Sequence, residues 1–377
     1  MLLNLLFIIA ACYLALLLAL IYGWNRITDF EPEYKAAEIK FSIIIPFRNE
    51  AENLPQLLES LKALKYPATH FEILLVNDDS EDESVEICSK YKVEEPPLDI
   101  STLETKRKSA SPKKDAIQTA VQKAQFPYII TTDADCLVPE LWLQTFNDFI
   151  LTSNAEMICG PVSFSNTKRR KLFQVFDELD FLSLQATTVG ALGIGQPFMC
   201  NGANLCYRKS TFLKAGGFSG NNNIASGDDV FLLQKFRERA LETGFLKSEH
   251  AIVETKPQQN FPQLISQRMR WAAKAPAYQS VFSKFAGLSV FLMNFSLIIS
   301  AFLVLFEIFP QQPVLIVFLL KFNADFILIF LAAKFFKREL VMRNYFWCSM
   351  VYPFFSTFIA IASLFISFHW KGRNFKS

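Results

Sequence analysis

The sequence predicts an α/β domain with a mainly parallel sheet, flanked by transmembrane helices. Two observations carry this prediction. Between residues 39 and 283, short β-branched runs alternate with segments of helical spacing, which is typical of parallel strands joined by crossover helices. At both ends of the chain, long apolar segments hold few or no charged residues, and their lengths match a hydrocarbon core of about 30 Å.

The composition excludes several other classes of protein. Hydrophobic residues make up 51% of the 377 and charged residues only 20%, which rules out intrinsic disorder. The 38 basic and 36 acidic side chains leave a net charge of +2, so nucleic acid is not an expected partner. The seven cysteines include no C-x-x-C pair and only three histidines accompany them, which argues against a zinc site or a disulfide framework.

Residues 1–25 predict an N-terminal transmembrane anchor. The segment 2–24 carries no charge, and Arg26, Lys35 and Lys40 follow it. A cleaved signal peptide, the alternative, would have a basic residue before the apolar run and small residues after it. Because basic residues gather on the cytoplasmic side, we expect the following domain in the cytoplasm, at the cell (inner) membrane.

Residues 284–369 predict a C-terminal membrane region with two or three spanning helices. Its three apolar runs are residues 286–306, 314–333 and 345–368. The uncharged link 310–313 is expected outside and the basic link 334–344 inside. The anchor and three further spans would then leave the tail, residues 370–377, outside, although this tail is basic and basic segments prefer the cytoplasmic side. The run that contains Pro353 is therefore a candidate for an interfacial or re-entrant segment.

Two features of the apolar segments leave alternatives open. Lys321 and Asp325 stand four residues apart and share a helix face. They are either a neutralised pair inside the helix bundle or a polar contact to a lipid headgroup or a translocating sugar chain. Residues 167–188 have a basic start and helically spaced apolar residues, which indicates either core packing or a helix lying in the membrane surface.

The elements of the central domain follow in order along the chain. Strands are expected at 41–45, 71–76 and 128–132, and helices at 53–64, 83–91, 112–124 and 139–151. Pro46 ends the first strand, and Pro112 suits the first turn of a helix. In such sheets ligands bind beyond the carboxyl ends of the strands, so these ends predict the site.

Acidic side chains follow all three predicted strands. Glu50 follows the first, Asp78 and Asp79 the second, and Asp133 and Asp135 the third. Adjacent acids repel one another unless a cation or hydrogen-bond donors compensate. A D-x-D at a strand end offers hard oxygens to Mg²⁺ or Mn²⁺, whose other positions go to substrate phosphates and water. Each acid alone is weak evidence, since turns and helix caps use the same residues, but three such ends in order predict a metal-assisted phosphate site.

Residues 41–275 resemble glycosyltransferase family 2, the GT-A fold of membrane synthases for hyaluronan, chitin, poly-N-acetylglucosamine and glucosylceramide. Seven blocks carry the resemblance: a nucleotide-binding strand (42–50), a V-D-D-G-S-T-D-like segment (72–82), a lysine-containing helix start (111–116), the D-x-D (132–135), an acceptor-side strand (200–209), a G-E-D-x-x-L-like block (226–232) and Q-x-x-R-W (267–271). The resemblance implies that residues 39–283 form a GT-A, Rossmann-like domain.

The resemblance also implies a donor site. Its nucleotide sugar, expected to be UDP-linked, would contact Pro46, Arg48, Asn49, Glu50, Asp78, Lys113, Asp133 and Arg270. Asp133 and Asp135 would bind the Mg²⁺ or Mn²⁺. Asn77 replaces the family's first aspartate and Asp79 its glycine, so the contacts of that loop are expected to differ.

The remaining blocks imply the acceptor site and the base. Asp229 would be the general base, with Asp228 beside it in the family's glutamate position. The acceptor-binding residues would be Gly202, Asn204, Gln267 and Trp271. Because no second carboxylate need attack the sugar, we expect a single displacement with inversion.

The favoured function is therefore a membrane-bound glycosyltransferase that moves a sugar to a lipid or glycan hydroxyl. Four spans at most are few for enclosing a polymer channel, which favours a lipid or short glycan as the acceptor. The Q-x-x-R-W block, however, is frequent in processive polysaccharide synthases, and such a synthase is the alternative. A catalytically inactive scaffold or transport subunit is a different class, and a soluble nucleotidyltransferase would need neither this block nor the spans. Membrane lipids are expected partners, and the oligomeric state is left open.

Overall fold

The structure is a computed structural model that describes residues 2–92, 99–166, 171–220, 224, 226–366, 368–370 and 373–375. The chain divides into two compact units. The sheet unit comprises Thr28–Asn166 and Met199–Lys256. The helical unit comprises Met1–Ile27, Thr167–Phe198 and Pro257–Ser377.

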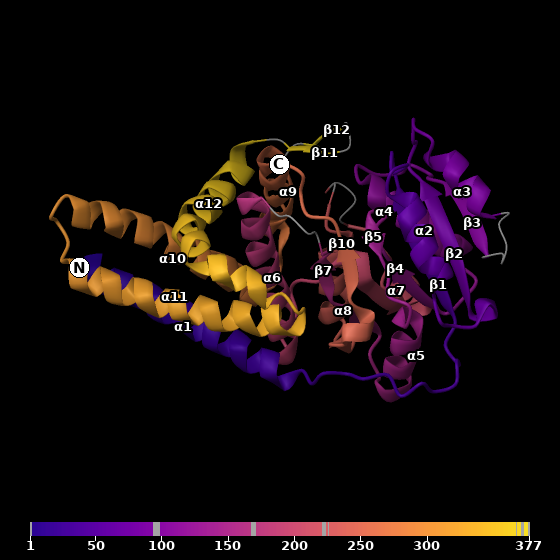
Figure 1. The fold of residues 1–377 in the computed structure, drawn as a ribbon, viewed down its shortest axis with the longest axis horizontal. Coiled ribbons are helices and arrows are strands. Elements are labelled where there is room, and N and C mark those ends of the chain that lie inside the picture. The colour runs from indigo at the N-terminus through magenta and orange to yellow at the C-terminus, as the bar shows by residue number, and fades with distance from the viewer. Residues whose placement is uncertain are drawn as a thin grey trace. The chain divides into compact units, whose positions relative to one another are not determined.

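A seven-stranded sheet forms the centre of the sheet unit, with the strand order β3-β2-β1-β4-β8-β6-β9. Figure 1 labels its strands β1, β2, β3 and β4. The strands are β1 (Phe41–Phe47), β2 (Phe71–Asn77), β3 (Ile100–Glu104), β4 (Tyr128–Thr131), β6 (Met157–Cys159), β8 (Leu205–Arg208) and β9 (Thr243–Phe245). The strands β1, β2, β3 and β4 run parallel to one another, and β8 is antiparallel to both β4 and β6. The predicted α/β fold with a mainly parallel sheet is confirmed.

Helices and a second, three-stranded sheet complete this unit. The helices are α2 (Leu54–Lys62), α3 (Ser84–Lys92), α4 (Pro112–Lys123), α5 (Trp142–Thr152), α7 (Lys209–Lys214) and α8 (Asp228–Glu238), with short 3-10 turns η1 (Ala68–His70), η2 (Gly202–Asn204) and η3 (Glu249–Ala251). The small sheet has the order β5 (Cys136–Leu137), β10 (Val253–Thr255), β7 (Val162–Phe164). The four predicted helices correspond to α2, α3, α4 and α5.

The strand β3 was not predicted from the sequence. Of its five residues only Ile100 is buried, so this edge strand lacks a continuous apolar run. The central strand β1 is the opposite case, since Ile43, Ile44 and Ile45 have no exposed surface. Both faces of a central parallel strand are covered, which is why the sequence of β1 reads as an unbroken apolar run.

The helical unit consists mainly of long helices. They are α1 (Leu2–Arg26), α6 (Leu172–Gly193), α9 (Phe261–Ala272), α10 (Val281–Leu305), α11 (Gln311–Phe335) and α12 (Tyr345–Phe365), joined by the 3-10 turns η4 (Ala275–Ala277) and η5 (Glu339–Asn344). Figure 1 shows α1, α10 and α11 running beside one another, and they pack together. In the described part of the chain, four helical segments are long and apolar enough to cross a membrane: Leu2–Arg26, Val281–Leu305, Gln311–Phe335 and Glu339–Phe365.

Three predicted segments lie partly outside the described residues. The run that contains Pro353 forms the single helix α12, with the proline inside it, and residue 367 of that run lies outside the described part. Of the basic tail 370–377, residues 371, 372, 376 and 377 lie outside the described part, and Arg373–Phe375 (β12) pairs with Phe368–Trp370 (β11). The basic start of segment 167–188 also lies outside it, at residues 167–170, and the following helix α6 is largely buried, as core packing requires.

The charged pair in α11 is neutralised inside the bundle. The Lys321 ammonium lies 2.5 Å from the Asp325 carboxylate, and the Tyr13 hydroxyl donates to the same carboxylate at 2.6 Å. Lys321 is 4% exposed. Burying charge in an apolar region is costly unless a partner compensates it. The first of the two interpretations of this pair is therefore confirmed.

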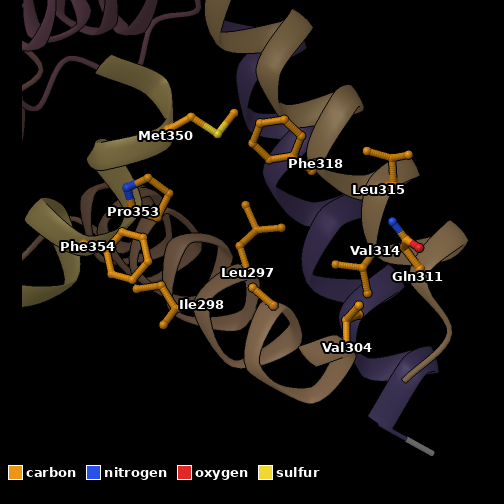
Figure 2. Close-up of a pocket in the computed structure, with 11 residues that line it drawn as sticks. Leu297, Ile298, Val304, Gln311, Val314, Leu315, Phe318, Met350, Pro353 and Phe354 are labelled. Atoms are coloured by element: carbon orange, nitrogen blue, oxygen red, sulfur yellow. The ribbon is translucent and has the colours of Figure 1, made fainter. Parts of the chain in front are cut away.

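An apolar groove lies between α10, α11 and α12. It has a volume of about 340 Å³ and is lined by α10, α11 and α12. Figure 2 shows Leu297 of α10, Phe318 of α11, and Pro353 and Phe354 of α12 around it, with Gln311 as its polar side chain. Its dimensions and lining suit a hydrocarbon chain.

Helices α1 and α6 approach each other closely through glycines. A Cβ on Gly190 would lie 2.4 Å from the carbonyl oxygen of Leu20, and one on Gly193 would lie 1.9 Å from that of Gly23. No side chain fits at such distances without moving a backbone. Small residues at helix crossings are a common means of close packing in membranes.

We predict that Gly190→Ala destabilises the protein by about 1–3 kcal/mol, because the added methyl group separates the two helices. The measurement is thermal unfolding of the purified protein in detergent. Gly287→Ala in α10 is the matched control, since no atom lies within 4 Å of its Cβ position. Equal midpoints for the two variants would contradict close α1–α6 packing.

Candidate functional site

Polar side chains gather where the parallel strands end. Because β1, β2, β3 and β4 run parallel to one another, their carboxyl ends lie at one edge of the sheet. Arg48 follows β1, Asp78 follows β2, Arg107 follows β3 and Asp133 follows β4. This edge therefore holds the predicted donor-site residues of the sheet unit.

The segments that follow β1 and β2 are tied together. The Arg48 guanidinium donates to the carbonyl oxygen of Asp78 at 2.8 Å and to that of Asp79. The backbone N–H of Asn49 donates to the Ser80 hydroxyl at 3.1 Å. Asp79 adopts a positive φ of 63°, which is why this position suits the glycine of the family pattern. Aspartate tolerates this conformation better than most side chains.

Two further predicted donor residues support the same loops. Pro46 lies within β1, opposite Val76 of β2. The backbone N–H of Glu50 donates to the Ser84 hydroxyl at 2.8 Å, and the Asn53 amide donates to the Glu50 carboxylate at 2.5 Å. These contacts hold the β1 end against the start of α3.

Asp78 has an arginine partner that sequence reasoning missed. Arg107 lies 3.4 Å from the Asp78 carboxylate and 3.6 Å from that of Asp115 in α4. Glu104 accepts hydrogen bonds from the Asn77 amide at 3.0 and 3.1 Å. Both Glu104 and Arg107 belong to the unpredicted strand β3 or follow it. The acids at 78 and 115 were the signal in the sequence that a basic partner was needed.

Lys113 connects the D-x-D to the acids of α8. Its ammonium lies 2.6 Å from Asp133 and 3.4 Å from Asp228. Burial alone would lower the pKa of Lys113, but the charges of Asp133 and Asp228 outweigh burial and raise this pKa well above its ordinary value. The ammonium is therefore charged at any physiological pH. We call Asp133, Asp228 and Asp229, with Lys113, the acidic cluster.

Backbone geometry places the two acids of α8. Gly227 precedes the helix with a positive φ of 83°, a conformation that glycine adopts without strain. Asp228 and Asp229 then occupy the first turn of α8, where the helix dipole favours negative charge. The backbone N–H of Gly202 donates to the Asp229 carboxylate at 3.2 Å. A Cβ on Gly202 would lie only 3.0 Å from the Asp228 carboxylate, so glycine leaves the space that the acids occupy.

The chemistry of Asp133 and Asp135 suits a divalent cation, and their binding of one stays a prediction. The Asp133 side chain is 37% exposed, and Asp135 is partly buried beside Cys136. In the described residues, no group of three or more His, Cys, Asp or Glu side chains could by itself enclose a metal ion. Mg²⁺ and Mn²⁺ are often held by one or two carboxylates with substrate phosphates as further ligands, which matches this donor set.

The side chain of Asn204 connects several segments of the sheet unit by hydrogen bonds. The residue has no exposed surface, and its amide donates to the carbonyl oxygens of Pro161 and Ala251, each at 2.8 Å. Its side-chain oxygen accepts from the Trp142 indole at 3.0 Å. The structure thus assigns Asn204 a fully engaged packing role, and its contact with an acceptor stays a prediction.

The Q-x-x-R-W block lies on α9 in the helical unit. Gln267 accepts a hydrogen bond from Arg268, and the Arg268 guanidinium lies 4.4 Å from the centre of the Trp271 ring. The Trp271 ring also packs against Phe181 of α6, with ring centres 6.4 Å apart. Arg268 thus contacts two predicted acceptor-binding residues. The contact of Arg270 with a diphosphate stays a prediction.

Arg268 was missed by sequence reasoning and forms the main ion pairs of this helix. It binds Asp177 at 2.6 Å and Asp180 at 2.5 Å, and all three side chains are at most 7% exposed. Burial raises the pKa of Asp177, and the charge of Arg268 opposes that shift. Two acids three residues apart in a largely apolar helix were the signal that a buried cation faces them.

We predict that Arg268→Met lowers the free energy of unfolding by about 3–5 kcal/mol, because it leaves two buried carboxylates without their cation. Thermal unfolding in detergent measures this change. Arg343→Met, which removes an exposed arginine of the same unit, is the control and should leave the midpoint unchanged. A wild-type midpoint for Arg268→Met would show that the ion pairs do not stabilise the unit.

Comparisons with known proteins show the family to which the chain belongs. The glycosyl transferase family 2 model matches residues 42–211, and the glycosyl transferase family group 2 model matches residues 128–367, more than half of the chain. The glycosyltransferase AglE of Haloferax volcanii is 24% identical over 230 residues, which are 61% of this chain and 70% of that protein.

Two further proteins are similar to this chain. The poly(ribitol-phosphate) beta-N-acetylglucosaminyltransferase TarS of Staphylococcus aureus is 30% identical over 120 residues, 32% of this chain but only 20% of TarS. The mannosyltransferase PcManGT of Pyrobaculum calidifontis, solved with GDP-Man and Mn²⁺, has a TM-score of 0.58 at 16% identity, covering 94% of this chain and 99% of that one. This likeness agrees with the GT-A fold. The chain belongs to glycosyltransferase family 2, whose enzymes transfer sugars from nucleotide-sugar donors.

Proposed function

We propose that this protein is a membrane-bound, inverting, metal-dependent glycosyltransferase that moves a sugar from a nucleoside diphosphate to a hydroxyl of a lipid or short glycan. The observation that carries the proposal is the bridge that Lys113 makes between Asp133 and Asp228. It joins the strand-end acids to the acids of α8 in one cluster. A donor diphosphate and an acceptor hydroxyl would meet at such a cluster.

The donor would bind at the carboxyl edge of the sheet. The loops that Arg48 ties together, with Asp78 at their centre, would hold the nucleotide. Asp133 and Asp135 would hold Mg²⁺ or Mn²⁺, which neutralises the negative charge that builds on the departing diphosphate. A UDP-linked sugar is the first choice of donor. A GDP-linked sugar, such as the GDP-Man in complex with the mannosyltransferase from Pyrobaculum calidifontis, is the second.

Asp229 is a better candidate for the general base than Asp228. Asp228 is 9% exposed and its carboxylate is paired with the Lys113 ammonium at 3.4 Å, which leaves it little access to an acceptor. Asp229 is more accessible and accepts a hydrogen bond from the Gly202 N–H at 3.2 Å. Asp229 would take the proton of the acceptor hydroxyl while that oxygen attacks the anomeric carbon. One displacement of this kind inverts the configuration of the sugar.

The acceptor would be a lipid or a short lipid-linked glycan rather than a polymer crossing the membrane. Lys321 and Asp325 are paired with each other inside the bundle and are not left to line a polar path. Gln267 and Trp271 would contact the acceptor, since a tryptophan ring suits both sugar and lipid faces. The groove between α10, α11 and α12 would accommodate hydrocarbon. A processive synthase is the second candidate, because it shares the Q-x-x-R-W block.

The membrane topology follows the distribution of basic residues. Arg26 ends α1, and Lys334, Lys337 and Arg338 lie at the end of α11 or just beyond it. Basic residues mark the cytoplasmic ends of spanning helices. We therefore place residues 39–283 as the catalytic domain on the cytoplasmic side, between the anchor 1–25 and the membrane region 284–369.

We predict that Asp229→Asn lowers turnover by about 10²–10⁴-fold while nucleotide binding persists, because only the proton acceptor is lost. The assay follows release of nucleoside diphosphate from a panel of nucleotide sugars, with Mg²⁺ or Mn²⁺ and membrane lipids. Glu52→Gln, an exposed carboxylate, is the control. Wild-type turnover by Asp229→Asn would remove the proposed base. Absence of turnover by the wild type with every donor and acceptor would favour the inactive-scaffold alternative.

A further inference from the structure

We propose that the Lys113 ammonium is the resident cation of the acidic cluster, and that a divalent ion must displace it from Asp133. The divalent ion and the donor diphosphate would consequently bind cooperatively. This inference rests on the proposed function, because it assumes that Asp133 holds the metal. It goes further by assigning to one side chain the control of when the metal binds.

The geometry sets Lys113 and a metal ion in competition for one carboxylate. The ammonium donates to Asp133 Oδ1 at 2.6 Å. A metal ion bound to the same oxygen at about 2.1 Å would lie no more than about 4.7 Å from that ammonium. Like charges at this distance repel strongly in a partly buried site, and the Lys113 side chain is only 19% exposed. The two cations therefore cannot share Asp133 at low cost.

The surroundings of Lys113 explain why it remains with the acids until a donor arrives. Asp228 lies 3.4 Å from the same ammonium, and burial of Asp228 makes an uncompensated charge there costly. Gly202 closes the cluster, since its Cβ position is 3.4 Å from Lys113 Nζ. If no new anion is present, the Lys113 ammonium can leave Asp133 only by replacing a strong ion pair with contacts to water, which is unfavourable.

A nucleoside diphosphate supplies that anion. Its phosphate oxygens offer the flexible lysine chain a second partner close to its first one. They also provide the remaining ligands of the metal ion. Binding of the diphosphate therefore gives the displaced ammonium a new partner and completes the coordination of the metal. Linkage then requires the effect to be reciprocal: the diphosphate raises metal affinity by the same factor by which metal raises diphosphate affinity.

The test measures Mn²⁺ affinity of the full-length protein in detergent by electron paramagnetic resonance, with and without UDP or GDP. Lys113→Met should bind Mn²⁺ about tenfold or more tightly than the wild type when nucleotide is absent, because a competing positive charge is gone. The nucleotide should then raise Mn²⁺ affinity much less in the variant than in the wild type. Lys113→Arg, which keeps the charge, should retain weak nucleotide-free binding.

The matched control is Lys123→Met, which removes a charge from the same helix about 15 Å further along it. It should behave as the wild type does. Equal nucleotide-free Mn²⁺ affinities for the wild type and Lys113→Met would overturn the inference while leaving sugar transfer intact. A wild type that binds no Mn²⁺ even with nucleotide would overturn it as well. If Lys113→Met raises nucleotide-free Mn²⁺ affinity as expected but the wild type releases nucleoside diphosphate from no donor, the inference stands and the proposed function is overturned.

Discussion

Compensation of clustered carboxylates by a few well-placed cations is the constraint on which this structure depends. The carboxyl edge of the parallel sheet brings Asp78 and Asp133 together with the acids that begin α8, and such a group of like charges is unstable by itself. Lys113 and Arg107 supply the opposite charge in the protein. A ligand that combines anionic phosphates with a divalent cation would suit this edge, because both acids and basic side chains are present there.

Carboxylates of the helical unit are likewise paired with cations, in less polar surroundings. Arg268 neutralises Asp177 and Asp180, and Lys321 neutralises Asp325 with help from Tyr13. Here the charged side chains are at most 14% exposed and have a structural role, since each carboxylate is already paired with a cation. The difference in exposure between these pairs and Asp133 separates charges that hold the fold from charges that can bind a substrate.

Much of the sheet unit could be predicted because local sequence and burial agree. The apolar runs of β1 and β2 are covered on both faces, and the acids directly after them mark the edge where ligands bind. The edge strand β3 lacks that signal, and with it Arg107 escaped prediction. Arg268 and its two acids are separated by about ninety positions, so their pairing depends on tertiary packing that no local pattern records. Asn204 matched an acceptor-side motif, yet its buried hydrogen bonds arise from segments far away in the chain.

The central claim is that Asp133 and the donor diphosphate share one divalent cation. The most direct test is ³¹P electron–nuclear double resonance on Mn²⁺ bound to the full-length protein with UDP. The account predicts a phosphorus coupling typical of a phosphate bound directly to Mn²⁺, and loss of this protein-bound signal in Asp133→Ala. Protein-bound Mn²⁺ without phosphorus coupling, or an unchanged signal in Asp133→Ala, would contradict it.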